Sequence, residues 1–403
     1  MRRGAMALRR VLELTRRLRL DDLPPALRWS SILYLTHILF QGKIAVSEIA
    51  GGFAWVLLIS AVDRKQIRPS LHILCYPLAL YGVASTISSL LAPQRMHLFG
   101  ESMLWVKMLF FPAALILMRE LPRVRQLALY GHAIFVTWIA CDGLLQFTMG
   151  RRDLEHRITG GATHVMTYSG ELLPLAVLFT ILWIHERKPW MLAPAVLPTI
   201  ALLLTFTRSA WLAWAFAMGL ILLFVKPRWI AYALPAAILF IALAPLPIFA
   251  RFISTFDTRL ESNLDRIRMA QAGVEIIRDY PLFGVGPANI KAVYPLYRMH
   301  DAPRLRVPHL HNNFIQIWAE RGIVALAAYI LLLCLFFREC ARAWRGPARR
   351  WAQAGIAAAA ALTCAGLFEF NFGDTEVFLL FLDILALVIV NIEAEGKVLS
   401  PES

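Results

Sequence analysis

The residues of this chain best suited to chemistry are two histidines and several arginines in one polar segment, from about Phe249 to Arg321. His309 and His311 alternate in the run V-P-H-L-H-N-N-F-I-Q-I-W-A-E-R-G, from Val307 to Gly322. Imidazole titrates near neutrality, so a neutral histidine can take the proton of a hydroxyl group as a general base. A planar guanidinium pairs well with phosphate oxygens. The arginines of the first part of the segment are Arg259, Arg266, Arg268 and Arg278.

Two arginines, Arg208 and Arg266, are the strongest candidates for contact with a ligand. Arg208 lies in T-F-T-R-S-A-W-L-A, where two apolar spans meet, and the alternative is an interfacial arginine that faces lipid headgroups. Arg266 lies on a predicted amphipathic helix from Ser262 to about Asp279, and the alternative is an exposed helix face. Arg268 is turned about 200 degrees from Arg266 on that helix, so it is a weaker candidate, as is Arg259. Two guanidinium groups together could hold a diphosphate without a metal ion.

Local signals predict the ends of that helix and the turn after it. Ser262 with Asp265 three residues later has the spacing of a capping box, and apolar residues follow at helical spacing until Pro281. The glycines of L-F-G-V-G-P predict a turn, after which Pro287 can start a second short helix through Tyr297. A dinucleotide fingerprint would need a third glycine and a strand, and the chain has no G-x-x-x-x-G-K-[ST] or D-x-D motif. These absences argue against a site for a soluble nucleotide.

An H-x-H pair can also supply two metal ligands on extended backbone. A third ligand would have to be His300, Asp301 or Glu320, and none of them has a recognisable ligand spacing. A structural role for His309 beside the N-terminus of the next helix is the other alternative. No cysteine has C-x-x-C spacing or lies in the polar segment. The sequence thus predicts no metal site, no cofactor and no disulfide among Cys75, Cys141, Cys334, Cys340 and Cys364.

The composition is that of a polytopic membrane protein. Of the 403 residues, 59% are hydrophobic and 17% are charged, which is too apolar for a soluble globule of this size. The net charge of +14 comes from short clusters between apolar blocks, so no nucleic-acid-binding face is indicated. A helix of about 20 apolar residues spans a bilayer. About twelve spans are predicted, at 28–42, 45–62, 71–92, 102–118, 127–149, 169–185, 190–206, 209–225, 229–249, 322–337, 352–369 and 374–392.

The distribution of basic residues predicts the orientation, because short loops rich in lysine and arginine remain in the cytoplasm. The basic connections are the N-terminus and residues 63–68, 119–125, 186–188, 226–228 and 338–350. With twelve spans all six fall on the cytoplasmic side, which puts the polar segment on the periplasmic side. The predicted parts are a cytoplasmic basic amphipathic segment (1–27), helices one to nine (28–249), a partly helical periplasmic catalytic loop (250–321), helices ten to twelve (322–392) and a cytoplasmic tail (393–403).

A charged residue within a membrane span costs free energy, so each one suggests a functional role. Lys107 and Asp142 fall toward the same side of the membrane and are predicted to pair or to flank a cavity, whereas Asp383 lies near mid-span. An internal ion pair is favoured over substrate contact for these groups. His37 and His132 are interpreted as polar groups of helix packing.

Three stretches resemble, in order, the signature of the O-antigen ligase and polymerase family. The resemblance covers roughly residues 150–340, and the P-L-F-G-V-G-P and H-N motifs are fairly specific together. Family members usually have a tryptophan where this chain has Met269 and Ala270. The resemblance implies an all-α, GT-C-like enzyme of the bacterial inner membrane with its site on the periplasmic side. The three stretches are Thr205 to Ala213, Asn263 to Pro287 and His309 to Ile323.

The resemblance also implies roles for single residues. His311 is the implied catalytic base, because its pair with Asn312 matches the H-N motif of the family. His309 and Asn312 are candidate substrate contacts, and Arg157 in R-I-T-G is an auxiliary one. The implied ligands of a lipid-linked diphosphate are Arg208 and Arg266.

The implied activity is that of an O-antigen ligase in lipopolysaccharide biosynthesis. Such an enzyme moves O-antigen polysaccharide from undecaprenyl pyrophosphate to lipid A-core, without a metal ion and with inversion at the anomeric carbon. A polyprenyl diphosphate is a good leaving group, so arginines and one base would suffice. The alternatives with the same donor are an O-antigen polymerase and a protein O-oligosaccharyltransferase. A lipid or solute transporter is the alternative of a different class, but the sequence shows no inverted repeat.

Overall fold

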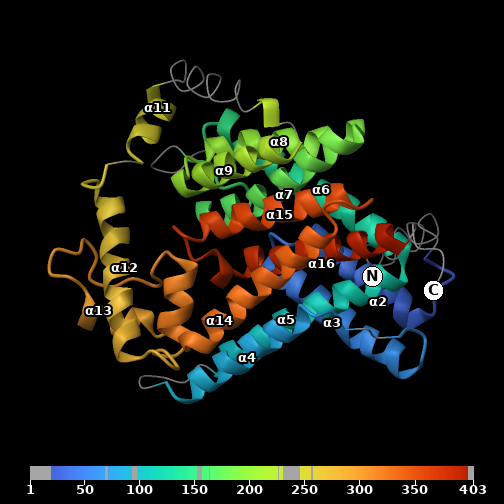
Figure 1. Cartoon of the computed structure of the whole chain (residues 1–403), viewed down its shortest axis with the longest axis horizontal. Coiled ribbons are helices and arrows are strands. Elements are labelled where there is room, and N and C mark those ends of the chain that lie inside the picture. The colour runs from blue at the N-terminus through green and yellow to red at the C-terminus, as the bar shows by residue number, and fades with distance from the viewer. Residues whose placement is uncertain are drawn as a thin grey trace, which may run out of the picture.

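The computed structural model describes residues 20–68, 71–92, 98–151, 157–162, 164–225, 227–229, 246–255 and 257–397. Every regular element in these ranges is a helix (Figure 1). The elements are α2 (Pro25–Leu39), α3 (Ile44–Asp63), α4 (Cys75–Leu90), α5 (Leu98–Glu120), α6 (Pro122–Thr148), α7 (Val165–Glu186), η1 (Pro189–Met191), α8 (Leu192–Leu204), α9 (Arg208–Val225), η2 (Pro227–Trp229), α11 (Leu246–Ile253), α12 (Glu261–Asp279), α13 (Ile290–Tyr297), α14 (Asn313–Arg342), α15 (Arg349–Ala365), η3 (Asn371–Gly373) and α16 (Thr375–Lys397).

The class predicted from composition is confirmed for the described residues, which form an all-helical, multi-pass membrane protein. Within the described ranges, six helices are long and apolar enough to cross a bilayer, namely α3, α5, α6, α7, α14 and α16. Two shorter apolar stretches, Pro189–Leu204 and Arg208–Phe224, accompany them. Most of the predicted span at 229–249 lies outside the described residues. The first 19 residues of the predicted basic segment at 1–27 also lie outside them. The total of twelve spans stays a prediction.

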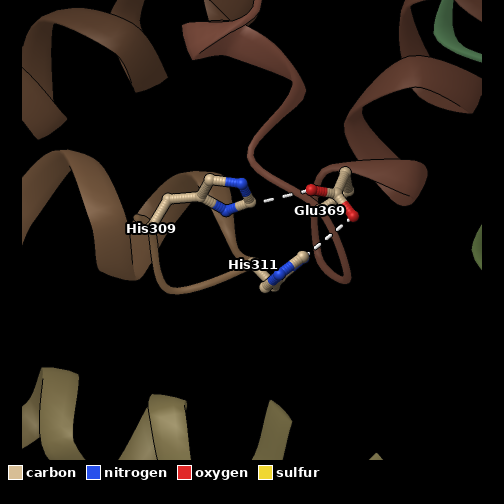
Figure 2. Close-up of side chains that lie close together, drawn as sticks. All are labelled: His309, His311 and Glu369. Atoms are coloured by element: carbon tan, nitrogen blue, oxygen red, sulfur yellow. Dashed lines mark hydrogen bonds and ion pairs between the residues drawn. The ribbon is translucent and has the colours of Figure 1, made fainter. Parts of the chain in front are cut away.

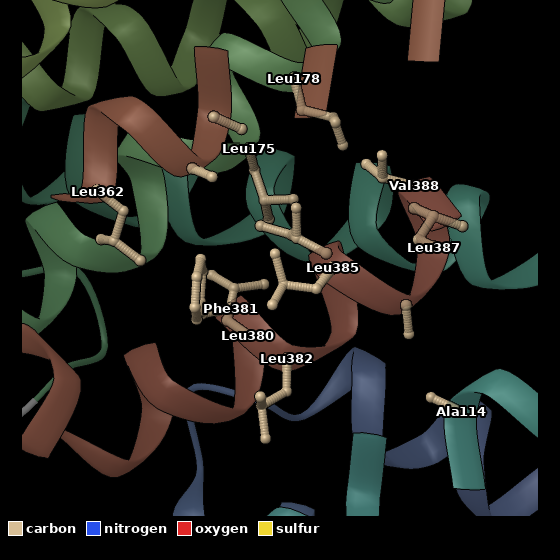
Figure 3. Packing of buried hydrophobic residues seen from close by; sticks show 14 of the residues in the cluster. Ala114, Leu175, Leu178, Leu362, Leu380, Phe381, Leu382, Leu385, Leu387 and Val388 are labelled. Atoms are coloured by element: carbon tan, nitrogen blue, oxygen red, sulfur yellow. The ribbon is translucent and has the colours of Figure 1, made fainter. Parts of the chain in front are cut away.

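The centre of the bundle is α7, which is mostly apolar and buried along nearly all of its length. It packs against α15 and, with α15, contacts α16. Figure 3 shows the result, with Leu175 and Leu178 of α7 facing Leu385 and Val388 of α16. Small residues permit this close approach, since a side chain at Gly170 would collide with Val377. This rigid centre supports the connections at both of its ends.

Basic connections that are far apart in sequence meet at one end of the bundle. Arg119, at the end of α5, donates two hydrogen bonds to Glu393 of α16 (2.8 and 2.6 Å). Arg350, at the start of α15, forms an ion pair with Glu186 at the end of α7 (3.2 Å). The helices α12 and α13 of the polar segment lie at the other end, to the left in Figure 1, where α14 begins. The contacts thus gather residues 119–125, 186–188 and 338–350 on the side away from the polar segment.

The polar segment is ordered around a small core of its own, separate from the membrane core. Two of its glycines have positive φ, Gly284 (66°) and Gly286 (90°), and the Val285 and Gly286 N–H groups donate to the carbonyls of Ala319 and Glu320 (both 2.9 Å). This predicted turn therefore docks on α14. The core residues are Met269, Ala272, Ile276, Val285, Ile290, Val293, Tyr294, Val307, Leu310 and Ala319.

Helix α14 is longer than predicted because it continues through a kink at Gly322 (φ 79°, ψ 178°). A side chain at Gly322 would collide with the carbonyl of Leu282, so only glycine allows the turn and the helix to meet here. The prediction placed the start of the span at residue 322, whereas the helix begins at Asn313. Its first nine residues thus belong to the functional end of the molecule.

Two local predictions in the polar segment are wrong. Helix α12 begins at Glu261 after Leu260, which makes no side-chain cap, so Ser262 and Asp265 form no capping box. Ser262 instead accepts a hydrogen bond from Arg208 (2.8 Å), and Asp265 pairs with Arg304 (3.1 Å). Tertiary partners have replaced the local cap. Helix α13 begins at Ile290, three residues after Pro287, because the intervening residues make a turn.

Within the described residues, Lys107 and Asp383 have partners, but Lys107 and Asp142 do not pair with each other. Lys107 pairs with Glu48 (3.4 Å) and donates to Thr375 (2.7 Å). Asp383 lies 2.9 Å from His37 and also accepts from Tyr34 and Gln41, so it belongs to a buried polar group. The internal ion pair stays a prediction. His37 and His132 are fully buried, which confirms their place in helix packing.

Candidate functional site

A cavity of about 660 Å³ opens where the polar segment meets the bundle. Its wall combines residues from the segment before α14, from α14 itself, from α5 and from the connection between α15 and α16. We call it the histidine cavity, and its acidic, basic and histidine lining residues are Lys107, His164, Arg304, His309, His311, Glu320, Arg321, Glu369 and Asp374. Lys107 therefore flanks a cavity, as predicted.

A second cavity of about 320 Å³ contains the two arginines predicted to hold a diphosphate. Arg208 comes from the start of α9 and Arg266 from α12, so the cavity forms where the polar segment folds back on the bundle. Apolar side chains share the wall with these cations, which suits an amphipathic ligand. We call it the arginine cavity, and its other lining residues are Ser209, Leu212, Thr255, Thr258, Asn263, Ile267 and Phe368.

The connection between α15 and α16 forms a boundary between the two cavities. Phe368 lines the arginine cavity and Glu369, the next residue, lines the histidine cavity. The start of α14 fixes this connection, since Asn312 Nδ2 donates to the Leu367 carbonyl (2.9 Å) and the Asn313 N–H donates to the Gly366 carbonyl (2.7 Å). The two predicted groups of residues thus lie on neighbouring sides of one short, well-anchored connection.

His311 Nδ1 lies 2.9 Å from Glu369 Oε2, and Figure 2 shows both histidines facing this carboxylate. With the proton of a neutral imidazole on Nδ1, the carboxylate accepts it and Nε2 keeps the lone pair that a base needs. The carboxylate would also stabilise the imidazolium formed after proton transfer, as in hydrolase triads. His311 and Glu369 therefore make an oriented base of the kind predicted for His311 alone.

The backbone at His311 is left-handed (φ 50°), which is uncommon outside glycine but tolerated by histidine. Strain of this kind costs about 1–3 kcal/mol and persists where neighbouring contacts hold it. The residues on either side provide them: the Leu310 N–H donates to Gln316 Oε1 (2.7 Å), and Asn312 caps α14 by accepting from the Phe314 N–H (2.9 Å). The left-handed backbone at His311 thus directs its imidazole toward Glu369.

The charges around Glu369 keep it ionised. Burial alone would raise the pKa of Glu369, but the hydrogen bond and charge of His311, together with His309 and Arg266, lower it below its ordinary value. Arg266 Nη2 lies 3.9 Å from Glu369 Oε2, so the arginine and the imidazole share one carboxylate. Burial lowers the pKa of Arg266, and Glu369 opposes that effect. Because the ordinary pKa of arginine is so high, the guanidinium stays cationic.

His309 differs from His311 in its environment. Burial, helped by the charge of His311 and opposed by Glu369, lowers the pKa of His309 from 6.5 to about 4. Its Nδ1 is 3.9 Å from Glu369 Oε1 and makes no hydrogen bond within the described part of the chain. The cap of α14 is Asn312, so His309 does not have the capping role considered from sequence. His309 is a neutral wall residue of the cavity near neutral pH.

This lowered pKa predicts a loss of stability in acid. In the unfolded chain His309 becomes protonated near pH 6.5, whereas in the folded chain it stays neutral until about pH 4. The free energy of unfolding therefore decreases as the pH drops from 6.5 to 4. The difference amounts to on the order of 3 kcal/mol. We expect His309→Gln to lose less stability than the wild type between pH 7 and 4.5, measured by thermal unfolding of the purified protein. An equal acid loss in both proteins would contradict the buried neutral state of His309.

The structure also changes the metal question raised by the H-x-H pair. Within the described residues, His309, His311 and Glu369 offer ligand atoms that lie within 4.8 Å of one another. The third potential ligand is therefore Glu369 and none of the three residues considered from sequence. Arg266 contributes a fixed positive charge beside the same carboxylate, which opposes the approach of a cation. The expectation of a metal-independent site stays a prediction.

Arg208 lines its cavity but also holds the polar segment in place. Its Nη1 donates to the Ser254 carbonyl and its Nη2 to Ser262 Oγ, both at 2.8 Å. The side chain is buried at the junction of α9, α11 and α12. Several N–H groups of Arg208 therefore already donate to the chain itself. Arg266 is the more exposed cation of the pair.

The remaining candidates lie in different surroundings. Arg157 lines neither of the two cavities; its neighbour Ile158 bonds to the end of α8. The side chain of Asn312 is engaged on both its oxygen and its nitrogen, which positions His311. Arg268 pairs with Asp301 (2.5 Å), in agreement with its weaker ranking. Glu320 accepts from the Ala288 N–H (3.0 Å) and so fixes the glycine turn against the cavity.

Sequence reasoning missed Glu369, which is separated from His311 by 58 residues. Only its position in a polar connection, N-terminal to the last span and among apolar residues, could have drawn attention to it.

A profile of the protein family described as O-antigen ligase matches residues 193–330. The matched range contains Arg208, Arg266, His309 and His311 and ends before Glu369. No curated protein sequence matches the chain significantly.

Proposed function

Because residues 193–330 match the O-antigen ligase family, we propose that the chain transfers O-antigen polysaccharide from undecaprenyl pyrophosphate to a hydroxyl group of lipid A-core. This match supports a glycosyltransferase-like enzyme that uses lipid-linked polysaccharide. The observation that carries the finer proposal is the pair of neighbouring cavities, one with two arginines and one with an oriented histidine, on either side of the Phe368–Glu369 connection.

The arginine cavity suits the donor. Its cations Arg208 and Arg266 match a diphosphate, and Leu212, Ile267 and Phe368 offer apolar surface for the adjoining prenyl chain. As the bond from the anomeric carbon to the diphosphate oxygen breaks, negative charge develops on that oxygen. Cations already in place stabilise this charge without reorganisation, so the leaving group needs no proton.

The histidine cavity suits the acceptor. A hydroxyl group bound there gives its proton to Nε2 of His311 while its oxygen attacks the anomeric carbon from the face opposite the leaving diphosphate. The new glycosidic bond replaces the bond to phosphate, and the anomeric configuration inverts. Glu369 holds the imidazole during attack and stabilises it once protonated. Lys107, Arg304 and Arg321 share the wall with Glu320, Glu369 and Asp374, so the cavity offers both donors and acceptors to a polar acceptor.

Surface glycans of a strain that lacks this chain distinguish the proposed ligase from its nearest alternatives. A ligase predicts loss of all polymer from lipid A-core with accumulation of lipid-linked polymer. A single attached repeat would indicate an O-antigen polymerase, and intact lipopolysaccharide with unglycosylated protein would indicate a protein O-oligosaccharyltransferase. Complementation with the intact chain is the control for each outcome.

The proposal requires that the polar segment face the periplasm, opposite the basic end of the bundle. Arg278 on α12 is well exposed, with 68% of its side chain accessible, and Arg64 is exposed at the basic end. We expect Arg278→Cys, in a chain whose own cysteines are replaced by alanine, to react with an impermeant thiol reagent in cells with a permeabilised outer membrane. Arg64→Cys should react only after lysis. The reverse pattern would overturn the orientation and the proposed side of catalysis.

A further inference from the structure

A third cavity, of about 350 Å³, lies at the basic end of the bundle, where α6 and α15 begin and α7 and α16 end. Helix α7 has 22 residues and runs from the functional end to this one, a distance of about 33 Å at 1.5 Å per residue. The cavity is thus one membrane thickness away from the histidine cavity. We call it the basic cavity, since its wall contains Arg123, Arg125, Lys188 and Arg350.

The charge of the basic cavity is positive even after its own carboxylates are counted. Glu186 pairs with Lys188 (2.5 Å) and Arg350 (3.2 Å), and Glu395 accepts from Arg350 Nη2 (2.5 Å). Four cations therefore face two carboxylates. The cavity also receives the N-termini of α6 and α15, neither of which has a side-chain cap. The positive ends of these two helix dipoles favour an anion at this place.

Aromatic residues connect the basic cavity to the apolar side of the bundle. Tyr130 and Trp190 line it and pack edge to face, with ring centroids 4.9 Å apart. Below Tyr130, Ile134 and Trp138 follow at intervals of four residues along the same face of α6, and both are exposed (56% and 70%). In a membrane protein such a face contacts lipid chains, and tyrosine and tryptophan mark the level of the headgroups.

Helix α8 presents a matching face beside α6. Its exposed residues Leu192, Val196 and Ile200 also recur every four residues, and the two helices pack against each other. A cationic cavity at headgroup level thus continues into apolar faces of two adjacent helices. A free anion would use only the cavity, whereas a phospholipid would use the cavity and both faces.

We propose that the basic cavity binds the phosphate headgroup of an anionic phospholipid, whose acyl chains lie along the exposed faces of α6 and α8. Basic pockets between membrane helices recognise such headgroups, and the basic connections place this one at the cytoplasmic leaflet. The lipid contacts the ends of α7, α15 and α16, and the connection between the opposite ends of α15 and α16 contains Glu369. This site is independent of the proposed transfer reaction.

Native mass spectrometry of the purified full chain tests this inference with phosphatidylglycerol and phosphatidylethanolamine of identical acyl chains. We expect the anionic lipid to bind more tightly to the wild type. A cation near a membrane surface contributes about fivefold in affinity, so Arg123→Gln/Arg125→Gln should weaken phosphatidylglycerol binding by about 30-fold. The matched control is Arg64→Gln/Arg68→Gln, which removes two exposed arginines at the same end but outside the cavity and should bind as the wild type does.

A variant that binds the anionic lipid more tightly than the wild type provides a second test, which does not depend on a loss of affinity. Gln126 lines the cavity and is exposed, so Gln126→Lys should tighten phosphatidylglycerol binding by about fivefold. Equal affinity for the two lipids, or unchanged binding by both the Arg123→Gln/Arg125→Gln and Gln126→Lys variants, would overturn the proposal. Displacement of the lipid by inorganic phosphate at millimolar concentration would also overturn it, because the cavity would then be a site for free anions.

Discussion

Replacement of His311 by alanine is expected to reduce the rate of glycan transfer about 10²- to 10⁴-fold, the usual contribution of a general base. The reason is the geometry at Nδ1, where Glu369 at 2.9 Å fixes the imidazole and leaves Nε2 to take the acceptor proton. The substitution removes no backbone contact, because Asn312 and the Leu310 N–H hold the turn independently of the imidazole. The variant should therefore fold, insert and bind the lipid-linked donor.

An assay with purified protein, lipid-linked O-antigen and lipid A-core measures this loss directly. His309→Gln is the matched control, because it changes the neighbouring imidazole, whose lowered pKa and weaker contact with Glu369 suit a wall residue. Its activity should stay well above that of His311→Ala. Undiminished turnover by His311→Ala would show that another group takes the proton. Activity that disappears with a chelator would instead favour a metal held by His309, His311 and Glu369.

The membrane helices were largely predictable, because a bilayer requires each crossing segment to satisfy its backbone hydrogen bonds internally and to be apolar over about 20 residues. The errors arise where tertiary contacts replace local signals. Gly322 interrupts the apolar pattern and so marked the start of a span, but the helix continues through it from Asn313. Ser262 has the sequence of a cap, yet Arg208 takes its hydroxyl group.

The types of residue in the candidate site could be predicted from the sequence, but its full set of residues could not. His311 and Arg266 stand out because a histidine pair and arginines in a polar segment are unusual between apolar spans. Glu369 carries no such signal, since it lies in a short connection before the last span and becomes significant only when Asn313 draws that connection to the start of α14. Nothing local encodes a contact between positions this far apart in sequence.

The distinction between the two arginines also needed the structure. Arg208 and Arg266 have the same guanidinium and the same cavity, and sequence ranked them equally. Arg208 binds Ser254 and Ser262, so its removal would loosen the polar segment as well as the cavity. A loss of activity in Arg208→Ala would combine both effects. Arg266 has its long ion pair with Glu369 and a cavity-facing position, which makes it the cleaner test of donor binding.

We expect Arg266→Ala to reduce transfer about 10- to 150-fold, since a charge-assisted hydrogen bond contributes about 1.5–3 kcal/mol. Arg266→Lys should recover little of this, because a point charge cannot reproduce two parallel hydrogen bonds to phosphate oxygens. Arg268→Ala is the matched control: it lies two residues away on α12, pairs with Asp301 and should transfer glycan at nearly the wild-type rate. The same purified assay, at equal protein level and with donor titrated, should show the loss in Arg266→Ala alone. Wild-type transfer by Arg266→Ala, or full rescue by lysine, would remove the bidentate diphosphate contact from the mechanism and leave the charge on the leaving group to Arg208.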